Sequence, residues 1–252
     1  MNYPGHTIQF QAIDDIASVK AIQQQLNKKG CGPVKINGDY DVNTSHAVML
    51  FQTRFNDVSG NPLDADGIVG PITWAALFGA KNIKPIVTPP NNLLTAVLDI
   101  ARSQIGVVEF PSGSNEGPGV NKYQDAVGIP HGQRWSMAFV YWCFNQACIN
   151  LEIVNPVFKT GDVLQGWRKA KGKILTNHDA KVNTSLVLPG QVFFIATGGG
   201  HGHAGLVEKN ENGLLTTIEG NICVNSIDGA IGVFRRTGRI IDTITTGFIQ
   251  FE

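Results

Sequence analysis

Four polar residues in the second half of the chain have the types and surroundings needed for acyl transfer through a covalent intermediate. Ser136 falls where the loop 132–135 runs into an amphipathic segment, which predicts a side chain in the first turn of a helix. There the helix dipole and unpaired backbone amides stabilise a thiolate and can form an oxyanion hole. His203, Glu219 and Asn221 follow far downstream. The setting therefore predicts a nucleophile at position 136, where a thiol would suit the surroundings and a hydroxyl is present.

His203 is the expected general base, because it opens a segment with strand-like alternation at 203–209. Glu219, at the end of the next predicted strand, would orient the imidazole. Asn221, two residues on, would share that face and help to fix the imidazole or the oxyanion. His201 is the rival base, but only His203 has the strand residues of the motif after it. Two histidines in a glycine loop without a third ligand nearby predict no metal site, and no cofactor is expected.

The cysteines at positions 31, 143, 148 and 223 are too few and too scattered for a disulfide framework, and we expect buried thiols. Cys143 lies seven residues after Ser136 on the predicted helix. At 1.5 Å per residue it would sit about 10 Å further along, away from the amides of the helix start. Cys143 is therefore not expected to replace the missing nucleophile.

The elements that position these residues change in character along the chain. Helical stripes are predicted at 93–101 and from 136 to 147, with a glycine- and proline-rich loop at 109–119 between them. Strands are predicted beyond Pro189, at 191–196, 203–209, 214–219, 231–236 and 246–251, with hairpin turns at 210–213 and 222–229. Helices followed by an antiparallel sheet predict an α+β domain over residues 93–252.

A small helical module is predicted before this domain, over residues 1–79, and the proline-bearing stretch 80–92 is predicted to be a semi-extended linker. The module contains a short internal repeat, in which 38–44 is echoed by 67–73. In each copy a glycine turn leads to a threonine, Thr44 or Thr73, that is predicted to cap a helix. Two turn–helix units packed face to face are expected.

Composition narrows the class of partner. Twenty basic and twenty acidic residues cancel, so no broad field draws the protein to nucleic acid or to an anionic membrane. The first residues show no basic stretch followed by an apolar run, and no segment approaches the roughly 18 apolar residues of a membrane span. We therefore expect synthesis in the cytoplasm without an export signal, and a polar, uncharged or mixed-charge partner.

Residues 18–79 resemble the peptidoglycan-binding module of many cell-wall hydrolases. The resemblance rests on the apolar stripes with Gln23 and Gln52, on the turn 37–40, and on the string Asp-Gly-Ile-Val-Gly-Pro at 66–71 followed by Thr73 and Trp74. Asp41 stands where that family usually has glycine. The resemblance implies a three-helix fold that holds glycan or stem peptide in a shallow groove. The turn residues proposed to contact this substrate are Asp39, Tyr40, Asp66 and Ile68.

Residues 95–251 resemble the CHAP family, the cysteine- and histidine-dependent amidohydrolases and peptidases with a papain-like core. The matching segments are 105–106, 132–140 with Trp142, 189–194, 203–207 and 217–221. The resemblance implies that position 136 is the nucleophile, His203 the general base, Glu219 the orienting acid and Asn221 an accessory polar group. Ser136 departs from the family, which has cysteine there.

The two resemblances together imply a peptidoglycan hydrolase that cleaves an amide bond, within the stem peptide or between muramic acid and L-alanine. Three explanations of Ser136 stay open: a deliberate substitution of cysteine that inactivates the enzyme, a natural serine variant with residual hydrolysis, and a non-catalytic wall-binding pseudoenzyme. Delivery also stays open. A phage-type endolysin would be released to the wall, whereas a secreted antibacterial effector would be injected into the periplasm of a rival cell and would have secretion machinery and an immunity protein as partners.

Overall fold

The structure is a computed structural model that describes the 252 residues except 13, 59, 61, 80–85, 212 and 224–228. The chain forms two compact units, one that holds the first three helices and one that holds the six strands and the helices packed on them. The first six residues of the predicted linker 80–92 lie outside the described residues. Its last residues already belong to the second unit, since Asn91 caps the helix that begins at Asn92.

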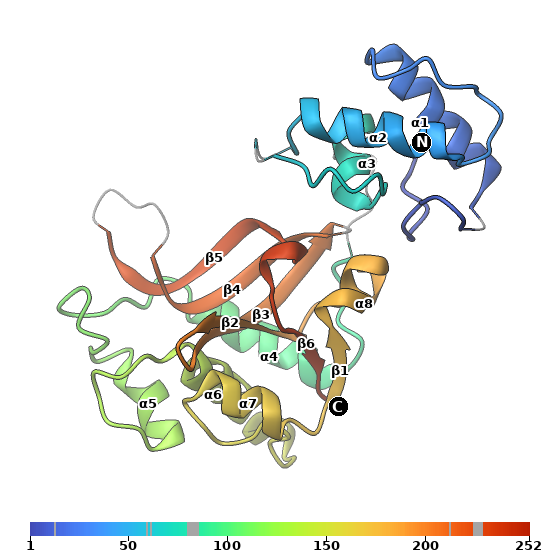
Figure 1. Cartoon of the computed structure of the whole chain (residues 1–252). Coiled ribbons are helices and arrows are strands. Elements are labelled where there is room, and N and C mark those ends of the chain that lie inside the picture. The colour runs from blue at the N-terminus through green and yellow to red at the C-terminus, as the bar shows by residue number, and fades with distance from the viewer. Residues whose placement is uncertain (13, 59, 61, 80–85, 212, 224–228) are drawn as a thin grey trace. The chain divides into compact units, whose positions relative to one another are not determined.

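The first unit consists of three helices around one apolar core, as Figure 1 shows in blue and cyan. These are α1 (Ile16–Lys28), α2 (Val42–Arg54) and α3 (Pro71–Phe78). Helices α1 and α2 bury their predicted stripes, with Ile22, Val48 and Phe51 fully removed from solvent. Trp74 of α3 completes this core and lies edge-on against Tyr3, with ring centroids 5.6 Å apart.

The internal repeat is a repeat of hydrogen bonds as well as of sequence. Gln23 in α1 and Gln52 in α2 are both buried, and each side-chain amide donates to three oxygens at the same sequence separations of 14, 16 and 21 residues. The acceptors are a side-chain oxygen, a backbone carbonyl and a threonine hydroxyl: Asn37, Asp39 and Thr44 for Gln23, and Asp66, Ile68 and Thr73 for Gln52. Each glutamine therefore fastens the turn that follows its helix to the helix after that turn.

The prediction that Thr44 and Thr73 cap helices is wrong. Asp41 is the N-cap of α2 and its carboxylate accepts the Thr44 backbone amide at 2.8 Å, while Gly70 is the N-cap of α3 and Pro71 is its first residue. Both threonines lie one turn further in, where their hydroxyls meet the glutamines. Asp41 has an extended backbone with φ −76°, so this position does not need the glycine usual in the resembled family.

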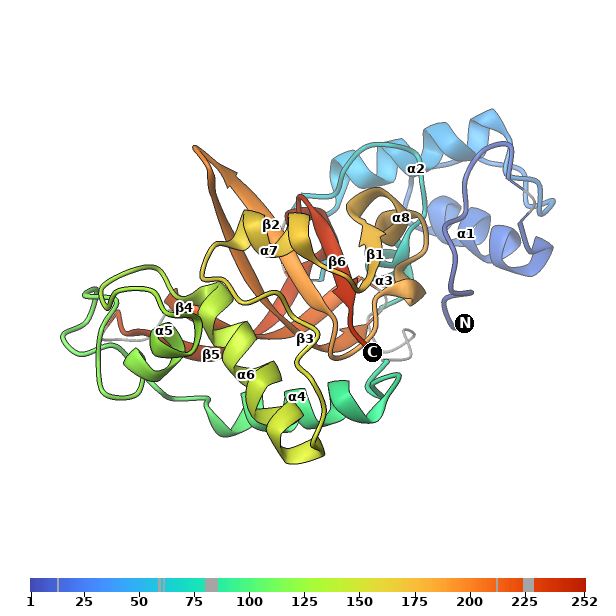
Figure 2. The same ribbon diagram turned by 90° about the horizontal axis from the view of Figure 1, so that it is seen from below.

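Four helices of the second unit gather on one face of its sheet, which Figures 1 and 2 show from two directions. They are α4 (Asn92–Ser103), α5 (Asn121–Val127), α6 (Ser136–Leu151) and α7 (Val163–Lys169). The apolar residues of α4 and α6 pack with Phe194, Leu206 and Ile218 from the strands into the larger core. The sequence did not predict α5 or α7, which have seven residues each and carry too few apolar positions to show a period.

The sheet has six strands in the order β1-β6-β2-β3-β4-β5. Their bounds are β1 Lys173–Thr176, β2 Val192–Gly198, β3 His201–Glu211, β4 Leu214–Cys223, β5 Ile231–Ile240 and β6 Gly247–Gln250. Strand β2 pairs antiparallel with both β3 and β6. The α+β class is confirmed, the five predicted strands are present within a few residues of their expected ends, and β1 is an additional edge strand.

The second face of the sheet carries a smaller core. Phe193, Val207 and Leu215 pack there with residues of the short helices α8 (Asn177–Val182) and η3 (Ile241–Thr243). Neighbouring residues such as Phe193 and Phe194 therefore enter different cores, as expected for a strand buried on both sides. Among the described residues, no helix combines the length and the apolar character needed to cross a membrane.

Candidate active site

Ser136 is the first residue of α6 and is almost completely buried. No side chain caps this helix: its N-cap is Trp135, and the first intrahelical bond runs from the Phe139 amide to the Trp135 carbonyl at 2.8 Å. The amides at the helix start are thus available to a negative charge at position 136. This is the environment in which a thiolate is stabilised and an acyl oxyanion can be held.

His203 and Glu219 form a hydrogen-bonded pair between β3 and β4. His203 Nε2 lies 2.7 Å from Glu219 Oε2, and the carboxylate is fully buried while the imidazole keeps 19% of its side-chain surface exposed. Burial would raise the pKa of Glu219, but hydrogen bonds from His203 and Arg239 and their charges outweigh it and lower this pKa to about 2. Since an ionised carboxylate only accepts, Nε2 must carry the proton, which leaves Nδ1 to act as a base.

Arg239 on β5 is a partner of Glu219 that the sequence did not predict. Its Nε donates to Oε1 and its Nη2 to Oε2, both at 2.8 Å, so the pair is bidentate and almost fully buried. Thr217 donates its hydroxyl to the same Oε1. Position 239 lies 20 residues beyond Glu219, on a strand whose predicted end was residue 236, and nothing in its local pattern distinguished it from the arginines at 235 and 236.

Asn221 points to the helix start. Its Oδ1 accepts the Trp135 backbone amide at 3.4 Å, and its Nδ2 donates to Glu109 Oε1 at 3.0 Å and to Asn115 Oδ1 at 2.9 Å. Asn221 has φ 61°, a left-handed backbone that interrupts the alternation of β4, so spacing from Glu219 does not give its direction. Asn221 therefore joins the helix start to the loop 109–119.

Glu109 is a second buried carboxylate near Ser136, and the sequence did not predict it. It is 4% exposed and accepts both the Trp135 indole N–H at 2.9 Å and the Asn221 amide. The Asn115 backbone amide donates to its other oxygen at 3.1 Å. A glutamate at the edge of a glycine- and proline-rich loop reads as a solvated residue, and only the partners brought by folding reveal its role.

Two glycines allow the strands to approach these side chains. A Cβ on Gly220 would lie 2.6 Å from the Trp135 ring and 2.8 Å from Phe139, so β4 packs its backbone directly on the start of α6. A Cβ on Gly205 would lie 2.9 Å from Glu219 Cγ. The glycines of the His-Ala-Gly and Glu-Gly-Asn segments are thus required by packing.

The tripeptide 219–221 connects the two halves of the site. Glu219 binds His203, Gly220 contacts Trp135, and Asn221 accepts the Trp135 amide next to Ser136. Within the part of the chain that the structure describes, no hydrogen bond joins Ser136 to His203, to Glu219 or to Asn221. The arrangement is therefore a paired base and carboxylate beside an uncapped helix start, with the hydroxyl not yet engaged.

Cys143, which is buried on the same helix, cannot take the place of a nucleophile at position 136. Cys143 is fully buried, and burial raises the pKa of its thiol well above the usual value, so it is a core residue. The expectation of buried thiols is wrong for Cys223, which is exposed at the end of β4, beyond the packed part of that strand. Among the described residues, no group of three or more His, Cys, Asp or Glu side chains has the arrangement of a metal site.

The four turn residues expected to contact substrate in the first unit differ in accessibility. Tyr40 is buried, and its hydroxyl donates to the Gly67 carbonyl at 2.9 Å. Asp66 is exposed but accepts the Gln52 amide and the Ile68 backbone amide, while Ile68 itself is half-buried. Asp39 is exposed and only its backbone takes part in the turn.

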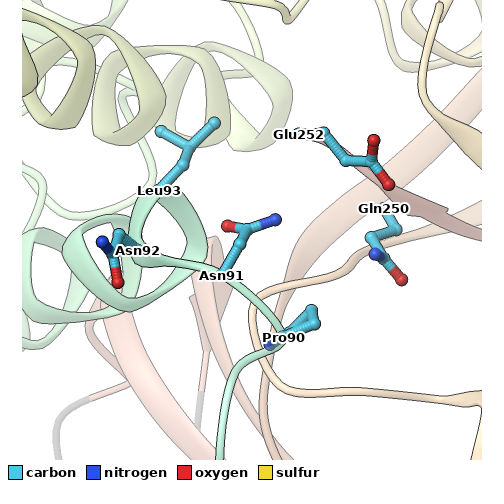
Figure 3. A pocket seen from close by; sticks show the side chains of 6 residues that line it. All are labelled: Pro90, Asn91, Asn92, Leu93, Gln250 and Glu252. Carbon is cyan, nitrogen blue, oxygen red and sulfur yellow. The ribbon is translucent and has the colours of Figure 1, made fainter.

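A pocket in the second unit lies between the start of α4 and the end of β6, as Figure 3 shows. Its lining residues are Pro90, Asn91, Asn92, Leu93, Gln250 and Glu252. None of these belongs to the pairs around Ser136 and His203, so the pocket is separate from the candidate site.

Two family models match separate parts of the chain. Residues 16–77 match the model described as "Putative peptidoglycan binding domain" and residues 128–221 match the CHAP domain. No curated protein matches the chain. Among solved structures, a chain of the X-ray crystal structure of PlyC is 17% identical, with a TM-score of 0.35, and the match covers 98% of this chain and 53% of that one. The present chain thus spans about half the length of the PlyC chain.

The CHAP match contains Ser136, His203, Glu219 and Asn221, and it ends before Arg239. Both matches concern domains that act on peptidoglycan, so they support a peptidoglycan hydrolase or binding role at the cell wall. A helical region that matches the peptidoglycan-binding model is thus followed by a region of the α+β domain that matches the CHAP model.

Proposed function

We propose that the protein is a peptidoglycan hydrolase of the Cys-His-Glu type that cleaves an amide bond, in the stem peptide or between muramic acid and L-alanine. The observation that carries this proposal is the tripeptide 219–221, which holds His203 on one side and the start of α6 on the other. A base held by a carboxylate next to an uncapped helix start provides the groups that covalent acyl transfer requires.

The chemistry follows from this arrangement when position 136 carries a thiol. His203 Nδ1 takes the thiol proton, and the thiolate attacks the amide carbonyl to form a tetrahedral oxyanion held by the helix-start amides. The oxyanion collapses, the C–N bond breaks, and the imidazolium gives its proton to the leaving amine. His203 then removes a proton from water, the hydroxide attacks the acyl-enzyme, and the released thiolate takes the proton back.

In this proposal, the chain with Ser136 is the inactive form of an enzyme whose nucleophile is a cysteine. A hydroxyl is several pKa units less acidic than a thiol, so His203 cannot keep an ion pair ready for attack. The features that support this view are the uncapped helix start, the buried Glu219 and the glycines that fit around them, all of which are retained. A natural serine variant and a non-catalytic wall-binding protein are the alternatives that an experiment can separate.

The test is restoration of activity by Ser136→Cys in the full chain, with Ser136→Ala and the double variant Ser136→Cys/His203→Ala as matched controls. We expect Ser136→Cys to clear a suspension of purified murein and release amino groups without new reducing sugars. Because general base catalysis contributes about 10²–10⁴-fold, the double variant should lose about that factor. Mass spectrometry of the products identifies the bond cut.

Three other outcomes would change the conclusion. New reducing sugars would contradict cleavage of an amide. Lysis by the parent serine protein at a rate near that of Ser136→Cys would make serine a working nucleophile. Sedimentation of folded Ser136→Cys with murein, without any new product, would leave only the wall-binding function.

The N-terminal region, residues 1–79, anchors the protein to the wall, and residues 80–92 connect it to the hydrolase domain at 93–252. Tethering raises the local concentration of substrate. Of the turn residues, Asp39 has an exposed side chain that the turn does not use, so Asp39→Ala should weaken sedimentation of the inactive parent protein with murein. Tyr40→Phe instead removes a buried hydrogen bond and should act through stability. Unchanged sedimentation of Asp39→Ala would exclude Asp39 from the contact surface.

The protein acts in the cell wall or periplasm after release or injection, as a phage-type endolysin or as a secreted antibacterial effector. Expression of Ser136→Cys in a bacterial host with and without a fused export sequence tests the place of action. We expect lysis only with the export sequence, whereas equal toxicity without it would point to a cytoplasmic target.

A further inference from the structure

Arg239 lies outside the part of the chain that matches the CHAP domain, yet it makes a bidentate ion pair with Glu219 of the candidate site. Both of its hydrogen bonds to Glu219 are 2.8 Å long, and only 7% of the Arg239 side chain is exposed. The guanidinium lies over the Phe193 ring, 5.0 Å from its centroid. The arginine is therefore held from two sides and has little freedom to leave the carboxylate.

Glu219 has no oxygen left for another role. Oε1 accepts from Thr217 and Arg239, and Oε2 accepts from Arg239 and His203. The carboxylate is fully buried, so water does not compete for these lone pairs. With both oxygens committed to two donors each, the carboxylate can neither rotate nor take up a proton without breaking a short hydrogen bond.

We propose that Arg239 is a positioning residue of the hydrolytic site, which keeps Glu219 ionised and fixed so that Glu219 accepts the hydrogen bond from His203 Nε2–H and leaves Nδ1 available as the base. This inference rests on the proposed function, in which position 136 carries the nucleophile. It divides the work among three side chains. His203 moves protons, Glu219 orients His203, and Arg239 holds Glu219 in place without touching substrate.

The planar fork of arginine matters as much as its charge. Two parallel N–H groups meet the two carboxylate oxygens and set the plane of Glu219, which in turn sets the direction of the imidazole. A lysine would supply a point charge and would not hold both carboxylate oxygens at once, so it would not fix the plane of the Glu219 carboxylate. Charge and orientation can therefore be separated by comparing lysine and methionine at position 239.

Arg235 offers a matched control on the same strand. It also binds a glutamate through its fork, donating from Nε to Glu208 Oε2 at 2.6 Å and from Nη2 to Glu208 Oε1 at 2.9 Å. Among the described residues, the side-chain partners of Glu208 are Arg102 and Arg235, which lie outside the candidate site, and Arg235 is 46% exposed. Arg235→Met thus removes an equivalent pair from β5 without disturbing His203.

The kinetic test uses Ser136→Cys as the active full-length protein and a soluble muropeptide as substrate. Misplacing a general base costs up to about 10²–10⁴-fold, so we expect Arg239→Met to lower kcat by about 100-fold with little change in KM. Arg239→Lys should recover part of this loss, and Arg235→Met should stay within about twofold of its parent. The acidic limb of the pH–rate profile should move to higher pH in Arg239→Met only, because the buried carboxylate then protonates more easily.

A second measurement does not depend on activity. In the serine protein, carbon-detected NMR of the Glu219 carboxyl follows its titration, and we expect the titration to move to higher pH in Arg239→Met and, by less, in Arg239→Lys. If Ser136→Cys proves inactive, the proposed function fails, and this titration still decides whether Arg239 controls Glu219.

The inference is overturned if folded Arg239→Met keeps both the kcat and the pH profile of its parent. Should Arg239→Met not fold, Arg239→Lys decides the matter. A lysine variant with the parent's kcat and Glu219 titration would show that the fork positions nothing.

Discussion

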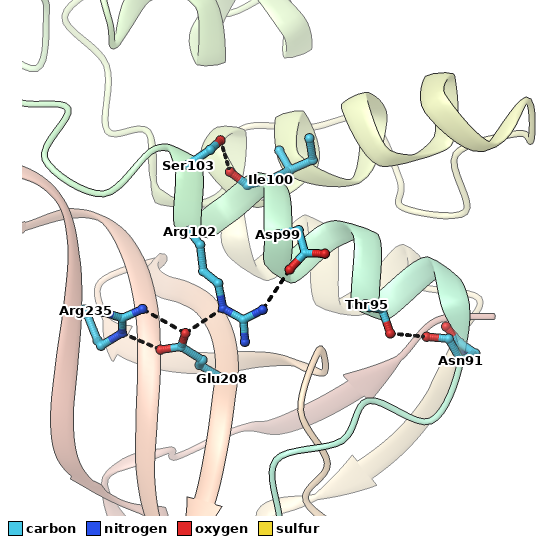
Figure 4. Close-up of polar contacts among 8 residues, drawn as sticks. All are labelled: Asn91, Thr95, Asp99, Ile100, Arg102, Ser103, Glu208 and Arg235. Carbon is cyan, nitrogen blue, oxygen red and sulfur yellow. Dashed lines mark hydrogen bonds and ion pairs between the residues drawn. The ribbon is translucent and has the colours of Figure 1, made fainter.

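Two arginine–glutamate pairs on the same sheet have nearly the same geometry and very different surroundings. In the first, Arg239 and Glu219 are 7% and 0% exposed and bind His203. In the second, Glu208 binds Arg235 and Arg102, as Figure 4 shows. The side chain of Glu208 is 10% exposed, and those of Arg235 and Arg102 are 46% and 40% exposed. Arg102 also reaches Asp99 of its own helix at 2.8 Å.

The two pairs differ in whether their charged groups can be solvated by water when a partner is lost. The arginines of the Glu208 cluster can turn to solvent when a partner is lost, so this cluster ties α4 to β3 and β5 at little risk to the fold. The Glu219 pair has no such alternative, since both charges are buried. Among the described residues, Arg239 donates to Glu219, and Glu219 accepts from Arg239, His203 and Thr217. A fold retains a buried pair of this kind most readily where a function needs it, which agrees with its contact to the candidate base.

The largest effect is expected from breaking the buried pair on one side. Glu219→Gln keeps the shape of the side chain but leaves the buried Arg239 charge without its counter-ion, which costs about 3–5 kcal/mol of unfolding free energy. Urea unfolding followed by tryptophan fluorescence measures this loss, because three of the four tryptophans lie in the second unit. A loss below about 1 kcal/mol would mean that the buried pair contributes no more to stability than the exposed one, and would contradict the distinction drawn between them.

A double variant sharpens the same point. Glu219→Leu combined with Arg239→Met replaces both charges by apolar groups, and such replacements of buried pairs are often neutral for stability. We expect the double variant to recover most of the stability lost in Glu219→Gln and none of the activity of the Ser136→Cys protein. Recovery of activity together with stability would show that the pair serves only the fold.

The next largest effect is expected in how the unfolding free energy depends on acid pH, to which the buried pair should contribute more than the exposed one. The pKa of Glu219 is lowered from 4.5 to about 2, so the folded state holds this carboxylate ionised where the unfolded chain protonates it. For a lowered pKa the stabilisation is complete above about pH 4.5 and is lost as the pH falls towards 2, and 2.5 units correspond to about 3 kcal/mol. Unfolding free energies measured between pH 6 and 2 should therefore fall less steeply in Glu219→Gln than in the parent.

A smaller effect is expected at the exposed cluster. Although burial raises the pKa of Glu208, hydrogen bonds from Arg235 and Arg102 outweigh it and lower this pKa, so its contribution is also lost in acid. Because both arginines are substantially exposed, we expect Glu208→Gln to cost only about 1 kcal/mol at pH 7, measured by the same urea unfolding. A cost equal to that of Glu219→Gln would mean that exposure of the arginines does not decide the outcome.

The two pairs also illustrate which features of the fold and the site could be predicted from the sequence. The α+β class, the internal repeat and His203, Glu219 and the start of α6 follow from short-range patterns: glycine turns, strand alternation and an amphipathic helix. These signals lie within a few residues of the feature they predict. The repeat was predicted from its glycines and threonines, and the glutamines that fasten it were found among the matching residues of both copies.

Arg239 and Glu109 could not be found in this way, because their side-chain partners are 20 or more residues distant and are chosen by the fold. In a regular strand, Arg235 and Arg239 would face the same side. Gly238 lies between them with φ 72°, however, and interrupts this alternation, so their spacing does not indicate that they bind different glutamates. The direction of Asn221 was hidden for the same reason, since its left-handed backbone departs from strand geometry.

The smallest effect, and the most direct check on the comparison, is expected for Arg235→Met. With 46% of its side chain exposed, this arginine should contribute about 0.2–1 kcal/mol to the unfolding free energy. At 1 M salt, where the screening length is about 3 Å, the difference between Arg235→Met and the parent should shrink further. The loss in Arg239→Met should persist in the same salt, because buried charges are poorly screened. Urea unfolding of both variants at low and high salt measures the two responses, and an equal response to salt would mean that burial does not distinguish these pairs.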